Sequence, residues 1–223
     1  ELEPIARLSG HPLISRRSIF HPLNQKAVAR IYASSIGRKY EDLNLIVAHM
    51  GGGISVGAHR HGRVVDVNNA LNGDGPFSPE RSGGLPTLQL SELCFSGKYK
   101  LPEVNAMLAG KGGIVAYLGT NSFKEASERA SGGDEYAALI VEGCAYQIAK
   151  EIGAMSAVLA GDVDCIILTG GLAYDTAHVE RVIRMVKHIA PVFVYEGEDE
   201  LQALAFNGYL AITGQISVRE YVG

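Results

Sequence analysis

The 223-residue sequence contains no tryptophan and only three cysteines, Cys94, Cys144 and Cys165. These cysteines are scattered and have neither the spacing of a metal site nor that of a disulfide framework. We therefore expect them to be small buried residues in a protein of a reducing compartment. The chain also lacks a basic block, and its net charge of −4 argues against nucleic acid as a partner.

Long hydrophobic runs are absent as well. No apolar run reaches the roughly 18 residues of a membrane span. No signal-peptide pattern opens the chain. The sequence therefore predicts a soluble, cytoplasmic protein with no membrane partner.

Glycine, by contrast, is abundant, with 27 residues, and three of them are adjacent at Gly51, Gly52 and Gly53. They separate an apolar run, Leu45–His49, from an alternating run, Ile54–His59, which predicts two strands joined by a tight turn. Adjacent glycines have two uses: a positive φ in a sharp hairpin, or a close approach of the backbone to another group. Such a turn can bind an anion through its N–H groups, although for a glycine turn taken alone a plain hairpin is the commoner explanation.

The pattern along the rest of the chain predicts a mixed α/β domain. A turn at His61-Gly62 leads to a third strand, Arg63–Val67, which completes an antiparallel meander. A long buried helix, capped by Asp134 and ending near Leu159, precedes a central apolar strand, Cys165–Leu168. Before the meander we expect an irregular segment at 1–20 and a helix with Asn24 as N-cap that stops at Gly37. After it we expect a long loop at 68–86 and a helical insert at 87–132, with helices at 88–95, 102–108 and 122–130. The chain should end with a helix at 179–189, a strand at 192–195 and a terminal helix at 200–212.

Two further places could carry chemistry. Thr169–Ala173 follows the central strand at its carboxyl end, where ligands bind in open α/β sheets; a tight strand-to-helix turn explains it equally well. Arg81 could fork onto a carboxylate or phosphoryl oxygen, and His21 could donate to a developing oxyanion. Taken alone, His21 is more often a buried structural histidine, and Arg81 is more often a surface residue in an ion pair. Together with the glycine turn, these features suit phosphoryl transfer, in which positioning and charge stabilisation carry most of the catalysis.

Three stretches resemble the butyrate kinases of the acetokinase family, in the superfamily of acetate and sugar kinases, heat-shock chaperones and actin. They are Arg16–His21, His49–Ser55 and Asn68–Pro86, and the resemblance runs along essentially the whole chain. It implies a single C-terminal actin-like ATPase domain (ribonuclease H-like), in which an antiparallel meander is followed by parallel strands with helices on both faces. Residues 1–22 would approach it from an N-terminal domain.

The resemblance also implies a function. The family transfers the γ-phosphoryl group of ATP to a short-chain carboxylic acid, here butyrate, giving ADP and an acyl phosphate, and catalyses the reverse reaction, with Mg²⁺. Family members are generally homodimers. Two alternatives stay open: a non-catalytic actin-like nucleotide-binding module, and a branched-chain fatty acid kinase.

Site residues follow from the same resemblance, motif by motif. His21 matches the transition-state histidine, and Arg81 matches the arginine that holds carboxylate and phosphoryl oxygens. The other implied residues are His49, Gly51, Gly52 and Gly53 in the second phosphate loop; Asn121, Ser122 and Lys124 as nucleoside contacts; Gly170, Gly171, Leu172 and Ala173 in the adenosine motif; and Glu200 at the metal.

Several positions depart from the acetate kinases. Gln25 replaces a second histidine, Gly52 replaces an asparagine, and Ser122-Phe123-Lys124 replace Asp-Met-Arg, as expected of a sister enzyme. The family's catalytic aspartate would precede Glu1, and its first phosphate loop would belong to an N-terminal domain. We therefore expect the 223-residue chain by itself to bind nucleotide weakly and to lack kinase activity.

Overall fold

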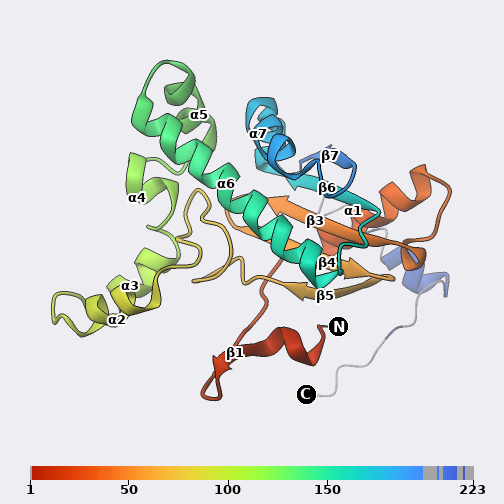
Figure 1. Ribbon diagram of the computed structural model, residues 1–223, viewed down its shortest axis with the longest axis horizontal. Coiled ribbons are helices and arrows are strands. Elements are labelled where there is room, and N and C mark those ends of the chain that lie inside the picture. The colour runs from red at the N-terminus through yellow and green to blue at the C-terminus, as the bar shows by residue number, and fades with distance from the viewer. Residues whose placement is uncertain (1, 198–204, 206–207, 215–217, 219–223) are drawn as a thin grey trace.

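The computed structural model describes residues 2–197, 205, 208–214 and 218. Its centre is a five-stranded sheet with the strand order β5-β4-β3-β6-β7 (Figure 1). The strands are β3 (Asn44–Met50), β4 (Ile54–Arg60), β5 (Arg63–Val67), β6 (Cys165–Gly170) and β7 (Val192–Glu196). β3, β4 and β5 form an antiparallel meander, whereas β6 runs parallel to both β3 and β7. The predicted order of a meander followed by parallel strands is confirmed.

Helices cover both faces of this sheet, also as predicted. Side chains alternate between the faces of a strand, so Ile46 and Ala48 of β3 join the core under α6 (Glu135–Val158) and α7 (Thr176–Val186). Leu45 and Val47 point the other way, into a core shared with α1 (Pro22–Ser35). His49, the next member of that second set, therefore lies on the α1 face.

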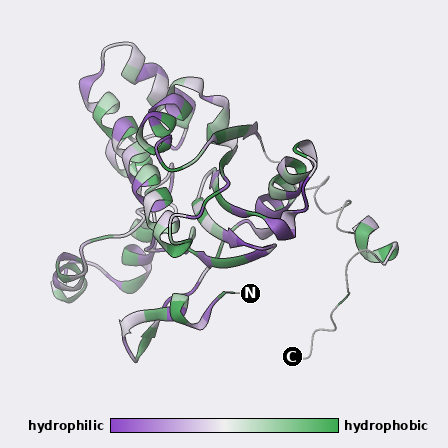
Figure 2. Ribbon diagram, turned by 45° about the vertical axis from the view of Figure 1, so that its right-hand side comes forward, coloured by the Kyte–Doolittle hydropathy of each residue, from purple (hydrophilic) through white to green (hydrophobic). Residues whose placement is uncertain are grey.

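The predicted helical insert contains four helices. They are α2 (Thr87–Phe95), α3 (Leu101–Leu108), α4 (Ile114–Leu118) and α5 (Phe123–Ser131). Figure 1 shows α2 and α3 projecting from the body as an arm, whereas α5 lies against the first half of α6. Hydrophobic and hydrophilic residues are mixed along this arm (Figure 2). None of the described helices is both long and apolar enough to cross a bilayer.

The N-terminal segment is more ordered than expected. A 3₁₀ turn, η1 (Pro4–Arg7), leads into a two-stranded antiparallel sheet of β1 (Leu8–His11) and β2 (Ile14–Ser15). Two further 3₁₀ turns follow later, η2 (Tyr40–Asp42) and η3 (Gly171–Tyr174). The expected terminal helix at 200–212 lies partly outside the described residues. Within that range the structure describes residues 205 and 208–212, and all of them are helical.

The start of α1 differs from the prediction in a way that matters for the site. Asn24 is not its N-cap: the helix begins at Pro22, with His21 in the N-cap position. A proline suits the first helical position because its missing N–H would have had no partner there. Asn24 therefore lies inside the helix, buried, and its side chain is available to the adjoining sheet.

Candidate active site

Two glycine turns leave the sheet side by side. Gly51–Gly53 connect β3 to β4, and His49 of β3 is in register with Thr169 of β6. Gly170 has a φ of +95°, and a Cβ built there would lie 2.5 Å from the Met50 carbonyl oxygen. Only glycine fits this contact, so the two predicted nucleotide turns meet at the carboxyl end of the parallel strands.

Of the two uses foreseen for Gly51–Gly53, the first is wrong. None of these glycines has a positive φ. A Cβ on Gly53 would instead lie 2.5 Å from the Ala70 carbonyl oxygen, so close approach to the 68–86 loop explains this glycine. Gly52 is exposed, and a Cβ there would meet nothing within 4 Å. Its backbone is therefore open to a ligand.

The 68–86 loop is anchored by hydrogen bonds to this turn and to the start of β4. The Asn68 side chain accepts from the Val56 N–H (2.7 Å) and donates to the Ile54 carbonyl oxygen (2.9 Å). The Ser78 hydroxyl donates to the Gly52 carbonyl oxygen over 2.5 Å. These bonds fix the loop that carries Arg81.

His21 and Arg81, the predicted catalytic pair, line one cavity of about 80 Å³. Its other lining residues are Ile19, Phe20, Gly53, Ala70 and Leu71. Arg81 Nη1 donates to the carbonyl oxygens of Ala70 (3.3 Å) and Leu71 (3.4 Å), which orients the guanidinium at the rim. The cavity thus combines a cation and an imidazole with apolar walls.

His21 is supported from behind by a second histidine. The rings of His21 and His49 stack with centroids 3.8 Å apart and planes 16° apart. His49 is fully buried, and its Nδ1–H donates to Asn24 Oδ1 over 2.9 Å. Burial, and secondly the neighbouring His21, lower the pKa of His49 to about 3. A neutral His49 lets the stack form without placing two positive charges in contact.

The predicted nucleoside contacts, Asn121, Ser122 and Lys124, lie at the start of α5. Ser122 is the N-cap of α5 and accepts from the Glu125 N–H (3.3 Å). Lys124 is 86% exposed and lies 3.8 Å from Glu128 on the same helix. Asn121 alone reaches the Arg81 loop, through a 3.1 Å bond from its Nδ2 to Glu80 Oε1.

Within the predicted adenosine motif, one residue presents an open backbone. Gly171 is exposed, and a Cβ there would meet nothing within 4 Å. Gly170 packs against Met50, and Leu172 and Ala173 are buried. A nucleoside could therefore approach the chain closely at Gly171.

The described residues contain no group of three or more His, Cys, Asp or Glu side chains that could hold a metal ion. The predicted metal residue, Glu200, lies outside the described residues.

Sequence reasoning missed the polar residues that surround the two histidines. Gln25 and Ser55 are fully buried next to His21, and His59 lies behind them. The spacing of His21, Asn24 and Gln25 was the available signal, because residues three and four positions apart share one face of a helix.

Comparison with known proteins identifies relatives over nearly the whole chain. The model of the acetokinase family matches residues 6–204. The chain is 56% identical over 221 residues to butyrate kinase 1 of Clostridium acetobutylicum and 53% identical to a probable butyrate kinase of Phocaeicola vulgatus. Each alignment covers 99% of this chain but 62% of the relative, so the chain spans less than two thirds of the length of these proteins.

Solved structures show the same fold at much lower identity. Porphyromonas gingivalis acetate kinase superposes with a TM-score of 0.83 at 20% identity, over 94% of this chain and 61% of that enzyme. Entamoeba histolytica acetate kinase gives 0.80 at 16% identity, over 95% and 63%. These matches confirm the predicted α/β architecture of the actin-like ATPase type.

Proposed function

Because the chain belongs to the acetokinase family, we propose that it supplies the phosphoryl-binding half of the active site of a butyrate kinase. The protein as a whole would transfer the γ-phosphoryl group of ATP to butyrate. The identity of 56% to a butyrate kinase supports this assignment. Because the chain spans 62% of that relative, the activity is proposed for a protein of the relatives' full length.

The reaction is a direct displacement at phosphorus. A carboxylate oxygen attacks the γ-phosphorus, the bond to the β,γ-bridging oxygen breaks, and ADP leaves with that bond's electron pair. Arg81 would hold the carboxylate and the equatorial phosphoryl oxygens with its guanidinium. His21 would donate a hydrogen bond to the phosphoryl group as negative charge spreads over its oxygens.

The nucleotide would lie along the two adjoining turns. Gly52 and Gly171 both have open backbone, so the phosphates would follow the first turn and the adenosine the second. Mg²⁺ is usually held by substrate phosphates and one or two carboxylates, and we expect it to enter with the nucleotide. No described residue is assigned to it.

One observation carries this proposal: His21 and Arg81 face the same small cavity, which has apolar walls of Ile19, Phe20, Ala70 and Leu71. A short-chain carboxylate has the same two parts, an anionic head and a small alkyl tail. A non-catalytic nucleotide-binding module would have no use for such a cavity.

The test is Arg81→Ala in a protein that contains this chain and has the relatives' full length. We expect butyrate-dependent turnover to fall about 10²- to 10³-fold, with the dissociation constant for ATP little changed. Arg184→Ala is the matched control, because Arg184 is exposed on α7 and pairs with Glu142.

Three outcomes would count against the assignment. Unchanged turnover in Arg81→Ala would remove the proposed role of that residue. Nucleotide binding without any butyrate-dependent turnover in the unmodified protein would favour the non-catalytic module. A higher kcat/KM for a branched acid than for butyrate would favour a branched-chain fatty acid kinase.

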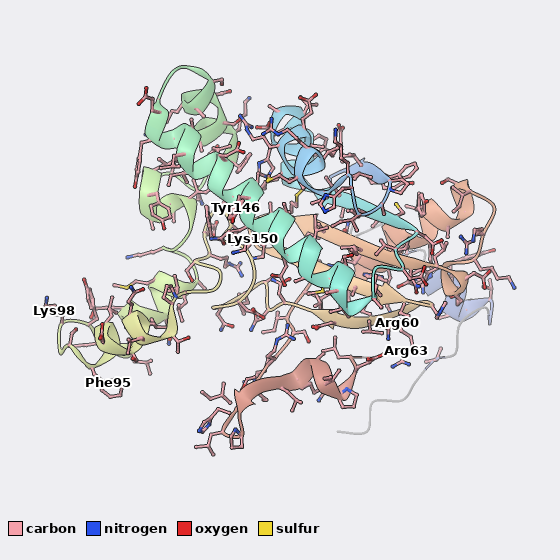
Figure 3. The ribbon with its side chains drawn as sticks, viewed as in Figure 1. Arg60, Arg63, Phe95, Lys98, Tyr146 and Lys150 are labelled. Atoms are coloured by element: carbon pink, nitrogen blue, oxygen red, sulfur yellow. The ribbon has the colours of Figure 1, made fainter. Side chains whose placement is uncertain are left out.

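We also propose a homodimer, with the α2–α3 arm at its interface. None of the residues of α2 is buried, and Phe95 at its end is 91% exposed and points away from the body (Figure 3). Leu88 of α2 and Leu101 of α3 are also largely exposed. Exposed apolar patches mark association sites, and the partner proposed is a second copy. Light scattering should give twice the monomer mass, and Phe95→Asp should reduce it; a monomeric mass for the unmodified protein at micromolar concentration would contradict the dimer.

A further inference from the structure

A buried chain of hydrogen bonds runs from the core of the domain to His21. Tyr40 Oη lies 2.6 Å from His59 Nδ1, and His59 Nε2 lies 2.9 Å from Gln25 Oε1. Gln25 Nε2 lies 2.9 Å from Ser55 Oγ, which is 3.1 Å from His21 Nδ1. Gln25, Ser55 and His59 are fully buried, and Tyr40 is nearly so. We call these four residues, Tyr40, His59, Gln25 and Ser55, the relay.

One backbone carbonyl group determines which atom donates and which accepts in each hydrogen bond of the relay. Gln25 Nε2 is also 3.2 Å from the Ser55 carbonyl oxygen, which can only accept a hydrogen bond. The amide nitrogen must therefore face Ser55, and Gln25 Oε1 must face His59. A carbonyl oxygen accepts, so His59 donates from Nε2, and in its neutral form His59 accepts at Nδ1 from the Tyr40 hydroxyl.

The hydrogen bonds of Ser55 also determine which nitrogen of His21 carries the proton. Ser55 Oγ accepts from Gln25 Nε2, so its own proton needs an acceptor. A buried hydroxyl without one costs about 1–3 kcal/mol. His21 Nδ1, at 3.1 Å, is the acceptor that the structure offers it. A His21 ring that accepts at Nδ1 carries its proton on Nε2.

The fold makes room for this arrangement. A Cβ built on Gly57 would lie 2.5 Å from Gln25 Oε1 and 3.3 Å from His59 Nε2. Gly57 does not need a positive φ, so its role is the space that it leaves. A side chain at this position of β4 would displace the Gln25 amide.

We propose that Gln25 is a positioning residue which, through Ser55, holds His21 in the tautomer with the proton on Nε2. Tyr40 and His59 set the orientation of the Gln25 amide. This inference rests on the proposed role of His21: the relay ensures that the imidazole meets the transferring phosphoryl group as a hydrogen-bond donor. His21 touches the substrate in this scheme, whereas the relay acts only through His21.

The decisive measurement does not need catalysis. In protein labelled with ¹⁵N-histidine, ring nitrogen shifts at pH 8 distinguish a protonated from an unprotonated nitrogen, and His21→Gln assigns the His21 signals. We expect an unprotonated Nδ1 and a protonated Nε2 in the unmodified protein. A proton on Nδ1 would overturn the proposal, whatever the enzymatic activity turns out to be.

Variants then test the cause. Ser55→Ala and Gln25→Met should each convert His21 to a mixture of tautomers. Ser78→Ala is the matched control, because Ser78 is an equally buried serine beside the glycine turn but outside the relay; it should leave the His21 tautomer unchanged. If Ser55→Ala keeps the tautomer of the unmodified protein, the relay does not set it. Should Ser55→Ala fail to fold, Gln25→Met and the milder Tyr40→Phe read the same signal.

The kinetic counterpart separates this inference from the proposed function. In the full-length enzyme, Ser55→Ala should lower kcat about 10- to 100-fold, a loss of the size found for partners that orient metal-ligating histidines, with KM for ATP and butyrate little changed. An enzyme without butyrate kinase activity would refute the proposed function, and the tautomer would still decide the relay. An unchanged kcat beside a changed tautomer would show that His21 does not act as the donor.

Discussion

At the scale of single residues, two adjacent glycines have different roles. Gly53 is packed against the backbone of the 68–86 loop, and its absent side chain is what allows the contact with Ala70. Gly52 is exposed, and a Cβ built there would meet nothing within 4 Å. The sequence Gly-Gly-Gly does not distinguish them, because the difference comes from a loop that folds back from residue 70.

This difference predicts opposite results from the same substitution. In Gly53→Ala the new methyl group would meet a backbone oxygen, which cannot move aside cheaply, so we expect a loss of about 1–3 kcal/mol in the free energy of unfolding. Gly52→Ala should change that free energy by less than about 0.5 kcal/mol. Urea unfolding followed by circular dichroism measures both. Equal effects of the two substitutions would show that the Gly53–Ala70 contact does not matter to the fold.

The residues of the candidate site differ in how far they could be predicted. His21 and Arg81 were identified by their motifs, and the structure brings them to one cavity. Ser55 and His59 were not identified, because their contacts depend on the Gln25 side chain of α1 reaching β4 rather than on any local pattern. Asn24 was assigned to a helix cap, whereas it binds His49.

At the scale of elements, strong periodicity predicted well and short elements were missed. The strands of the meander and the long helix α6 were placed to within about two residues, because alternation and a capping aspartate are local signals. The five-residue helix α4 and the hairpin β1–β2 were not foreseen. They are too short to show a period, and α4 depends on its contacts with α5 and α6.

Helix α7 shows which local signal is the stronger. Its apolar spacing predicted a helix over 179–189, yet the helix runs from Thr176 to Val186. Asp175 caps it by accepting from the His178 N–H over 2.9 Å. A cap satisfies an N–H group that would otherwise lack a partner, so it fixes the start of a helix more firmly than periodicity does.

At the scale of the whole molecule, the arrangement of the sheet depends on long-range pairing. β6 lies beside β3, although the two strands are more than a hundred residues apart in the chain. No local pattern encodes this neighbour relation, and the family resemblance implied only that parallel strands follow the meander; the β3–β6 pairing itself was not predicted. The pairing is what brings the two glycine turns together.

Two buried histidines and the partly buried Glu151 make the stability of the molecule depend on pH, with opposite signs. Burial lowers the pKa of His49 to about 3 and that of His178 to about 4, against 6.5 ordinarily. Between these lowered pKa values and pH 6.5, the unfolded chain binds more protons than the folded one. The two histidines therefore make stability rise with pH up to about 6.5.

Glu151 on α6 acts in the opposite direction. Burial, and secondly Asp74, raise its pKa from 4.5 to about 7. This carboxyl favours the folded state fully below pH 4.5, and that contribution is lost as pH rises through 7.

Glu151→Gln should therefore stabilise the protein only at neutral and alkaline pH. Glutamine has nearly the shape of a protonated glutamate but never ionises, so the variant avoids the cost of burying a carboxylate beside Asp74. At pH 4.5 and below, the free energies of unfolding of the two proteins should be close. At pH 8 the variant should be more stable by on the order of 2–3 kcal/mol, since each unit of pKa displacement corresponds to about 1.4 kcal/mol. Urea unfolding at intervals between pH 4 and 8 gives this difference directly, and a gain that is the same at both ends of the range would mean that Glu151 does not titrate as its burial requires.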